Sequence, residues 1–195
     1  TYDERLKFLS NYLQQLQMES GGKSVRTDGR SVKVKTSPIL WGGSGSEGQH
    51  SYFQLLTQGK RLVPVDFILP INSSGGHEKD HTISIADCLS QSEVMMEGYK
   101  SEDLKLCHPG NKPSNTIIFK QLNPESLGQL ISLYEHKVFV ENVIWGTNPF
   151  DQFGVELGKT LSNSLVKESS VDISYKGSNA STKSLLAKIK IIKEK

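Results

Sequence analysis

Cysteine is scarce in this sequence, and no spacing typical of a metal site is present. The 195 residues contain two cysteines, Cys88 and Cys107, and neither lies in a Cys-x-x-Cys or Cys/His spacing. Two thiols in a chain of this length favour a reducing compartment, where they pack as small hydrophobic side chains. We therefore expect a cytoplasmic protein of one domain or slightly more, with no bound metal.

An excess of charge of one sign is also lacking. The 23 basic and 21 acidic residues leave a net charge of +2, which gives no electrostatic argument for nucleic acid or a membrane surface as a partner. No apolar run approaches the roughly 18 residues of a membrane-spanning helix. Basic residues gather near the end of the sequence, at Lys183, Lys188, Lys190, Lys193 and Lys195. A solvated helix face explains these lysines better than a nucleic-acid patch does.

Glycine-rich residues 42–50 lie between a short apolar run and a helical pattern at residues 51–58. Strand, glycine-rich turn and helix is a layout in which backbone amides bind anions. The segment lacks Gly-Lys-Ser/Thr, which argues against a nucleotide-binding loop; a flexible linker is the other interpretation. We place His50 at the start of the following helix, where a side chain at a loop end can meet a ligand. A structural histidine is the alternative.

Short apolar segments alternate with helical patterns along the chain, and this order predicts an α/β fold with a mainly parallel sheet. Asp28-Gly29 indicates a hairpin turn before residues 31–35. The expected strands are residues 31–35, 38–41, 60–71 (with Pro64 unfavourable in the middle) and 116–119. The expected helices are residues 2–20, 51–58, 83–96, 124–145, a segment starting near 150, and 182–193.

A glutamate occupies an unusual position near the end of the first predicted helix. Glu19 lies in the last turn before Gly21-Gly22, where the helix dipole opposes a carboxylate. A placement that breaks a local rule marks a candidate functional position. Gln15 lies one helical turn earlier, so the two side chains share a face. A solvated glutamate is the alternative.

Two helical patterns meet at a turn in residues 135–159. Asn123 can cap the first helix, Pro124 suits its first position, and residues 146–149 (GTNP) end it. The second helix carries Gln152, Glu156 and Lys159 at steps of four and three, which places them on one face. On spacing alone, a solvated helix face is the simpler interpretation.

Three of these segments resemble, in the same order, motifs of the glucose-6-phosphate isomerase (phosphoglucose isomerase) family. They are residues 14–20 (QQLQMES), residues 41–59 with the glycine-rich loop, and residues 133–145 followed by 150–159 (FDQFGVELGK). The resemblance covers essentially the whole chain but only the C-terminal part of the family's usual length. The chain departs from the family pattern at Leu16, Gly43, Ser44, Glu47 and Val65.

The resemblance implies a fold as well as a reaction. The family is built from two sugar-isomerase (SIS) domains, each a three-layer α-β-α sandwich. Residues 1–166 would be the second SIS domain and residues 167–195 a C-terminal connection and helix, so the chain is expected to be a piece of a longer protein. The family interconverts glucose 6-phosphate and fructose 6-phosphate in glycolysis and gluconeogenesis, without metal or cofactor.

The resemblance also implies roles for particular residues. Glu19 matches the catalytic glutamate, His50 the ring-opening histidine and Lys159 the lysine near the ring oxygen. Gln15 and Gln152 match glutamines that contact the substrate. The histidine reaches the active site from the neighbouring subunit, which implies a homodimer. The substrate phosphate is bound mainly by the N-terminal SIS domain, which is absent from this chain, so residues 1–195 alone are expected to be inactive.

A non-catalytic SIS module that senses a phosphosugar and regulates a partner is the alternative function. Such a module would be expected to lose the glutamate, the histidine or the lysine. All three are present as Glu19, His50 and Lys159, which favours the isomerase.

Overall fold

The computed structural model describes residues 1–73, 75, 77–166, 177 and 179–194. The chain divides into two compact units, Thr1–Pro149 and Phe150–Lys195. The first unit contains η1 (Glu4–Leu6), α1 (Leu9–Gln14), η2 (Gln15–Glu19), α2 (Gly45–Gln49), α3 (Phe53–Thr57), β1 (Val65–Asn72), α4 (Glu78–Glu97), η3 (Leu104–Leu106), β2 (Ser114–Gln121) and α5 (Pro124–Trp145). The second contains α6 (Phe153–Leu165) and α7 (Ala180–Lys193).

A parallel sheet lies at the centre of the first unit. β1 and β2 pair in parallel, with Phe67 opposite Thr116 and Leu69 opposite Ile118, and α4 lies between them in the sequence. Parallel strands need such a crossover. The predicted α/β fold with a parallel sheet is confirmed. β1 begins at Val65, directly after Pro64, so this proline lies outside the strand.

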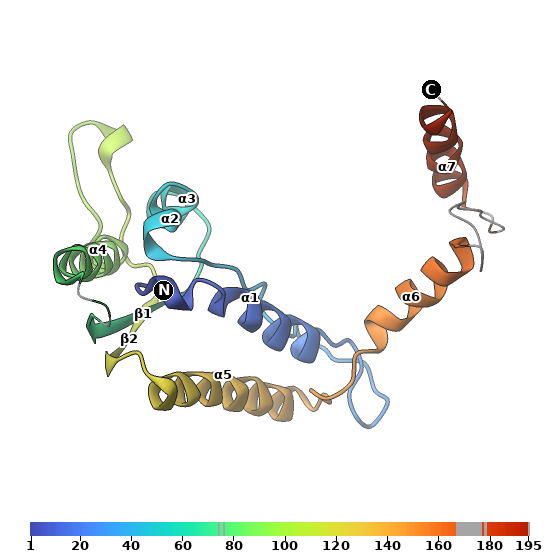
Figure 1. Ribbon diagram of the computed structural model, residues 1–195, viewed down its shortest axis with the longest axis horizontal. Coiled ribbons are helices and arrows are strands. Elements are labelled where there is room, and N and C mark those ends of the chain that lie inside the picture. Colours follow the sequence, from blue (N-terminus) through green and yellow to red (C-terminus); the bar gives the residue numbers. More distant parts are fainter. Residues whose placement is uncertain (74, 76, 167–176, 178, 195) are drawn as a thin grey trace. The chain divides into compact units, whose positions relative to one another are not determined.

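Helices cover both faces of β1, which gives the three layers of an α-β-α sandwich (Figure 1). Successive side chains of a strand point to opposite faces. Phe67 and Leu69 accordingly pack with residues of α3 and α4, including Cys88 and Met95. Ile68, between them, packs on the other face in a cluster with residues of α1 and α5. That second cluster contains Leu6, Leu9, Leu13, Leu122, Leu130 and Tyr134.

Two predicted strands do not form. Around Asp28-Gly29 the turn is present, with Gly29 at φ +83°, but only an isolated antiparallel bridge joins Val25 and Ser31. Residues 38–41 have no regular structure, and Ile39 is 83% exposed. Neither segment has a neighbouring strand in the described part of the chain, and strands need such a partner to satisfy their backbone groups.

Local capping determines where α5 begins and ends. Asn123 accepts a hydrogen bond from the Ser126 amide, Ser126 Oγ accepts one from the Asn123 amide, and Pro124 fills the first helical position. Gly146 ends the helix in the left-handed conformation, at φ +72°. Both ends agree with the sequence-based prediction.

Other helices differ from the prediction at their boundaries. The expected single helix of residues 2–20 consists of a 3₁₀ turn, a short α-helix and a π-helical turn. α4 begins five residues earlier than expected, at Glu78. In the second unit, α6 begins at Phe153, and Asn179 caps α7 by accepting a hydrogen bond from the Thr182 amide. The polar segment at 171–175 lies outside the described residues. Among those that are described, no helix has the length and apolar character needed to cross a membrane.

Candidate active site

The structure brings together Gln15 and Glu19, two of the predicted site residues. They lie at the two ends of η2, a π-helical turn, and Gln15 Nε2 donates a hydrogen bond to Glu19 Oε2 at 2.9 Å. Gln15 is exposed and Glu19 is half-buried. π-Helical turns inside longer helices occur often at functional sites. The arrangement holds a carboxylate in one orientation at an accessible position, as proton transfer to and from a ligand requires.

A third residue of the same turn, Gln17, was not predicted from the sequence. Its side chain is 1% exposed and contacts Lys137 and Glu141 of α5. The spacing gives one weak signal, because Gln17 follows Leu13 by four residues and so borders the apolar stripe of the predicted helix. The residue type opposes that signal, since glutamine is mostly exposed.

His50 lies on a different element from the one predicted. The glycine-rich loop itself forms a short helix, α2, and His50 is its exposed C-terminal cap, ahead of α3. The backbone of α2 packs closely against Tyr2 and Tyr52, which only glycine permits. A Cβ atom at Gly45 would lie 2.6 Å from Tyr2 Cζ, and one at Gly48 would lie 2.8 Å from Tyr52 Oη. In the described residues of this unit, His50 makes no hydrogen bond to Gln15 or Glu19.

Gln152 and Lys159 belong to the second unit. Gln152 is the N-terminal cap residue of α6 and Lys159 lies within the helix, and both side chains are exposed. No residue of α6 is buried. Glu156 is on the same helix and is also exposed. Among the residues of this unit that the structure describes, none covers these polar side chains.

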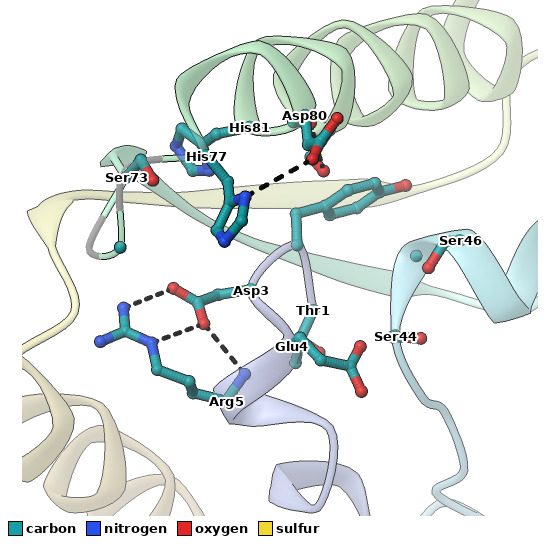
Figure 2. Close-up of a pocket in the computed structure, with 14 residues that line it drawn as sticks. Thr1, Asp3, Glu4, Arg5, Ser44, Ser46, Ser73, His77, Asp80 and His81 are labelled. Carbon is teal, nitrogen blue, oxygen red and sulfur yellow. Dashed lines mark hydrogen bonds and ion pairs between the residues drawn. The ribbon is translucent and has the colours of Figure 1, made fainter.

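A separate polar pocket lies in the first unit, beside the start of the chain and the N-terminal end of α4 (Figure 2). It holds about 340 Å³, and none of the five predicted site residues lines it. Arg5 donates two side-chain hydrogen bonds to Asp3, at 2.7 and 3.0 Å. Burial raises the pKa of the Asp3 carboxyl, but the hydrogen bonds from Arg5 outweigh it and hold that pKa below its usual range.

Metal-ligating side chains do not cluster in the part of the chain that the structure describes. Nowhere in it do three or more His, Cys, Asp or Glu side chains gather in a geometry suited to an ion. In the pocket, His77 lies 3.9 Å from Asp80, and His81 Nε2 lies 3.0 Å from the Ile71 carbonyl oxygen. These contacts are those of a structural polar cluster.

Comparison with known proteins identifies the family. The sequence model of phosphoglucose isomerase matches residues 1–186. The chain is 46% identical over 211 residues to a glucose-6-phosphate isomerase of Beijerinckia indica, covering 97% of this chain and 38% of that protein. It is 48% identical over 176 residues to one from Xanthomonas axonopodis, covering 89% and 35% respectively.

A solved structure agrees with these matches. A glucose-6-phosphate isomerase from Chlamydia trachomatis superimposes with a TM-score of 0.83 at 33% identity, over 98% of this chain and 37% of that one. The chain therefore spans well under half the length of the relatives it matches. The match to residues 1–186 and the shared fold show that this chain belongs to the phosphoglucose isomerase family.

Proposed function

We propose that this chain is the C-terminal part of an enzyme that interconverts glucose 6-phosphate and fructose 6-phosphate, with Glu19 as the base. The observation that carries the proposal is the π-helical turn in which Gln15 orients the Glu19 carboxylate. The reaction moves one proton between adjacent carbons through a cis-enediol. A single carboxylate that takes the proton from one carbon and returns it to the next suffices. Family membership supports this choice of reaction.

Ring opening needs a second set of groups, and we assign it to His50 and Lys159. A neutral imidazole takes the proton of the anomeric hydroxyl while the ring oxygen is protonated or held by the lysine ammonium. The ammonium also favours negative charge that develops nearby. Gln15 and Gln152 contact the substrate. The exposure of His50 and Lys159 supports these roles, because both side chains are accessible to a ligand. The proposed reaction uses no metal or cofactor.

Three features of the whole protein complete the proposal. In this proposal, residues 1–166 form a SIS domain, and residues 167–195 form a C-terminal connection and helix. A preceding SIS domain supplies the phosphate site. The enzyme is a cytoplasmic homodimer in which His50 is contributed across the subunit interface. The length of the relatives, of which this chain covers 38% or less, supports the additional domain.

Replacing the base tests the reaction. In the full-length protein, Glu19→Gln is expected to lower kcat by about 10²–10⁴-fold, the usual contribution of a general acid–base group. Folding should be unchanged, because a glutamine oxygen still accepts the Gln15 hydrogen bond. Glu102→Gln, at an exposed glutamate elsewhere in the same unit, is the control and should keep wild-type turnover. Wild-type turnover in Glu19→Gln would refute the assignment of the base. An inactive wild-type protein that still binds the sugar phosphate would favour the sensing module.

Subunit mixing tests the placement of His50. His50→Ala and Glu19→Gln homodimers should each be inactive. Mixed and re-associated, they should regain about a quarter of wild-type activity, because half of random dimers are hybrids with one intact site. If the mixture stays inactive although hybrids form, the histidine acts within its own subunit. Residues 1–195 expressed alone should show no isomerase activity, and measurable activity would contradict a phosphate site in a preceding domain.

A further inference from the structure

Gln17 is a buried polar side chain at the middle of the π-helical turn that carries Gln15 and Glu19. Its exposed fraction is 1%, whereas Gln15 is exposed and Glu19 half-buried. Glutamine is mostly found at protein surfaces, and a buried one needs hydrogen-bond partners to offset its lost solvation. The partners of Gln17 therefore determine what the burial achieves.

The Gln17 side chain closes a ring of three hydrogen-bonded groups with α5. Gln17 Nε2 donates to Glu141 Oε2 at 2.6 Å, and Gln17 Oε1 accepts from Lys137 Nζ at 2.9 Å. Lys137 Nζ also forms an ion pair with Glu141 Oε1 at 2.7 Å. Both polar ends of the Gln17 amide are thus satisfied by charged partners, and charge-assisted hydrogen bonds are stronger than neutral ones.

The backbone of the turn is held as well. The Gln17 carbonyl oxygen accepts a hydrogen bond from Ser37 Oγ at 3.0 Å, and also one from the Ser20 amide at the end of the turn. Ser37 itself adopts a left-handed conformation, at φ +55°. Such a conformation in a non-glycine residue persists where the surroundings hold it in place. Gln17 is therefore fixed through its side chain and through its carbonyl group.

A π-helical turn is rare and depends on contacts with its surroundings. The contacts of Gln17 with α5 therefore determine the directions of the side chains on either side of it. Gln17 lies two residues from both Gln15 and Glu19, and its bonds to Lys137 and Glu141 fix the rotation of the turn about the helix axis. We propose that Gln17 is a positioning residue, which with Lys137 and Glu141 directs the Glu19 carboxylate toward the substrate. This inference depends on the proposed role of Glu19 as the base.

An exchange of the two partners tests the inference in the full-length protein. Gln17→Glu faces the Glu141 carboxylate with a second negative charge and removes the donor of the 2.6 Å bond. The variant Gln17→Glu/Glu141→Gln reverses this bond, keeps the acceptor for Lys137 and restores the net charge. We expect Gln17→Glu to lower kcat by about 10–100-fold and to raise KM by a smaller factor through Gln15, because small misplacements of a catalytic group have effects of this size. The exchanged variant should recover most of the lost kcat.

Two further variants separate positioning from folding. Tyr134→Phe removes a hydrogen bond between α5 and Asp66 that involves no member of the ring, and should leave kcat unchanged per folded molecule. Lys137→Met removes one member of the ring at a side chain that is 40% exposed, so the protein should fold even where Gln17→Glu does not. Lys137→Met should lower kcat several-fold.

The outcomes distinguish this inference from the proposed function. If wild type is active, Glu19→Gln is inactive, and Gln17→Glu and Lys137→Met both turn over at the wild-type rate, the positioning role is refuted while the function stands. Failure of the exchanged variant to recover kcat, although it folds, also refutes it. If Glu19→Gln keeps wild-type turnover, the proposed role of Glu19 as the base is refuted, and with it the positioning role of Gln17.

Discussion

The buried pair Asn142 and Thr147, at the end of α5, gives a stability prediction whose size follows from the structure. Asn142 is 0% exposed; it accepts a hydrogen bond from Thr147 Oγ1 at 2.7 Å and donates one to the Val138 carbonyl at 2.9 Å. Asn142→Ala loses both, at about 1 kcal/mol each. It also leaves the Thr147 hydroxyl, in a residue 5% exposed, with only its long bond of 3.5 Å to the Asn142 carbonyl oxygen, which costs about 1 kcal/mol more.

We therefore expect Asn142→Ala to lower the free energy of unfolding by about 3 kcal/mol or more. Urea unfolding at equilibrium, followed by tryptophan fluorescence, measures this loss. Thr147→Val should also destabilise the protein, because it leaves Asn142 Oδ1 without a donor. The double variant should be at least about 1 kcal/mol more stable than the sum of the single losses predicts, since one shared bond is counted twice.

Additive losses in this cycle would refute the reasoning, as would a loss below about 1 kcal/mol for Asn142→Ala. The backbone hydrogen bond from the Thr147 amide to the Asn142 carbonyl remains in all three variants, so the end of the helix is preserved. Ser132→Ala, at a half-buried position of the same helix, is the matched control and should change stability by no more than about 0.5 kcal/mol.

Three further predictions concern single side chains. Burial and, to a smaller extent, the Asp66 carboxylate raise the pKa of the Tyr134 phenol. The protonated phenol therefore stabilises the fold fully below the unfolded pKa of about 10, and this contribution is lost as pH rises toward the folded pKa. Tyr134→Phe should cost about 1 kcal/mol at pH 7 in urea unfolding, and less above pH 10; a loss that grows with pH would contradict this sign. Burial raises the pKa of the Cys88 thiol to about 11, so a maleimide should label Cys107 in the native protein and leave Cys88 unmodified, as mass spectrometry would show. Gly146→Ala should lower thermal stability by about 1–2 kcal/mol, because φ there is +72°, and an unchanged melting temperature would contradict the left-handed cap.

Features fixed by neighbouring residues could be predicted from the sequence. The ends of α5 follow from Asn123, Pro124 and Gly146, which act within one or two turns of the helix. The pairing of Gln15 with Glu19 follows from their spacing, and the hydrogen bond of 2.9 Å between them agrees with it. The parallel sheet follows from the order of apolar and helical segments.

Features that depend on distant partners could not be predicted. The glycine-rich residues form α2 because Gly45 packs against Tyr2, some forty residues earlier in the chain. Residues 38–41 are as apolar as a buried strand, but the described part of the chain offers no neighbouring strand to pair with them. The burial of Gln17 depends on Lys137 and Glu141, which are more than a hundred residues away. Local propensity carries no information about such contacts.

The π-helical turn has a consequence for how this segment tolerates change in length. A π-helical turn accommodates one residue more than an α-helical turn, so it is equivalent to an insertion in the helix. Each residue of an α-helix advances the chain by about 100° around the axis. Deleting one residue between Gln15 and Glu19 would thus replace the π-helical turn by an α-helical one and change the angle between these two side chains about the helix axis. The length of this turn, like the identity of its residues, therefore determines how Gln15 and Glu19 face each other.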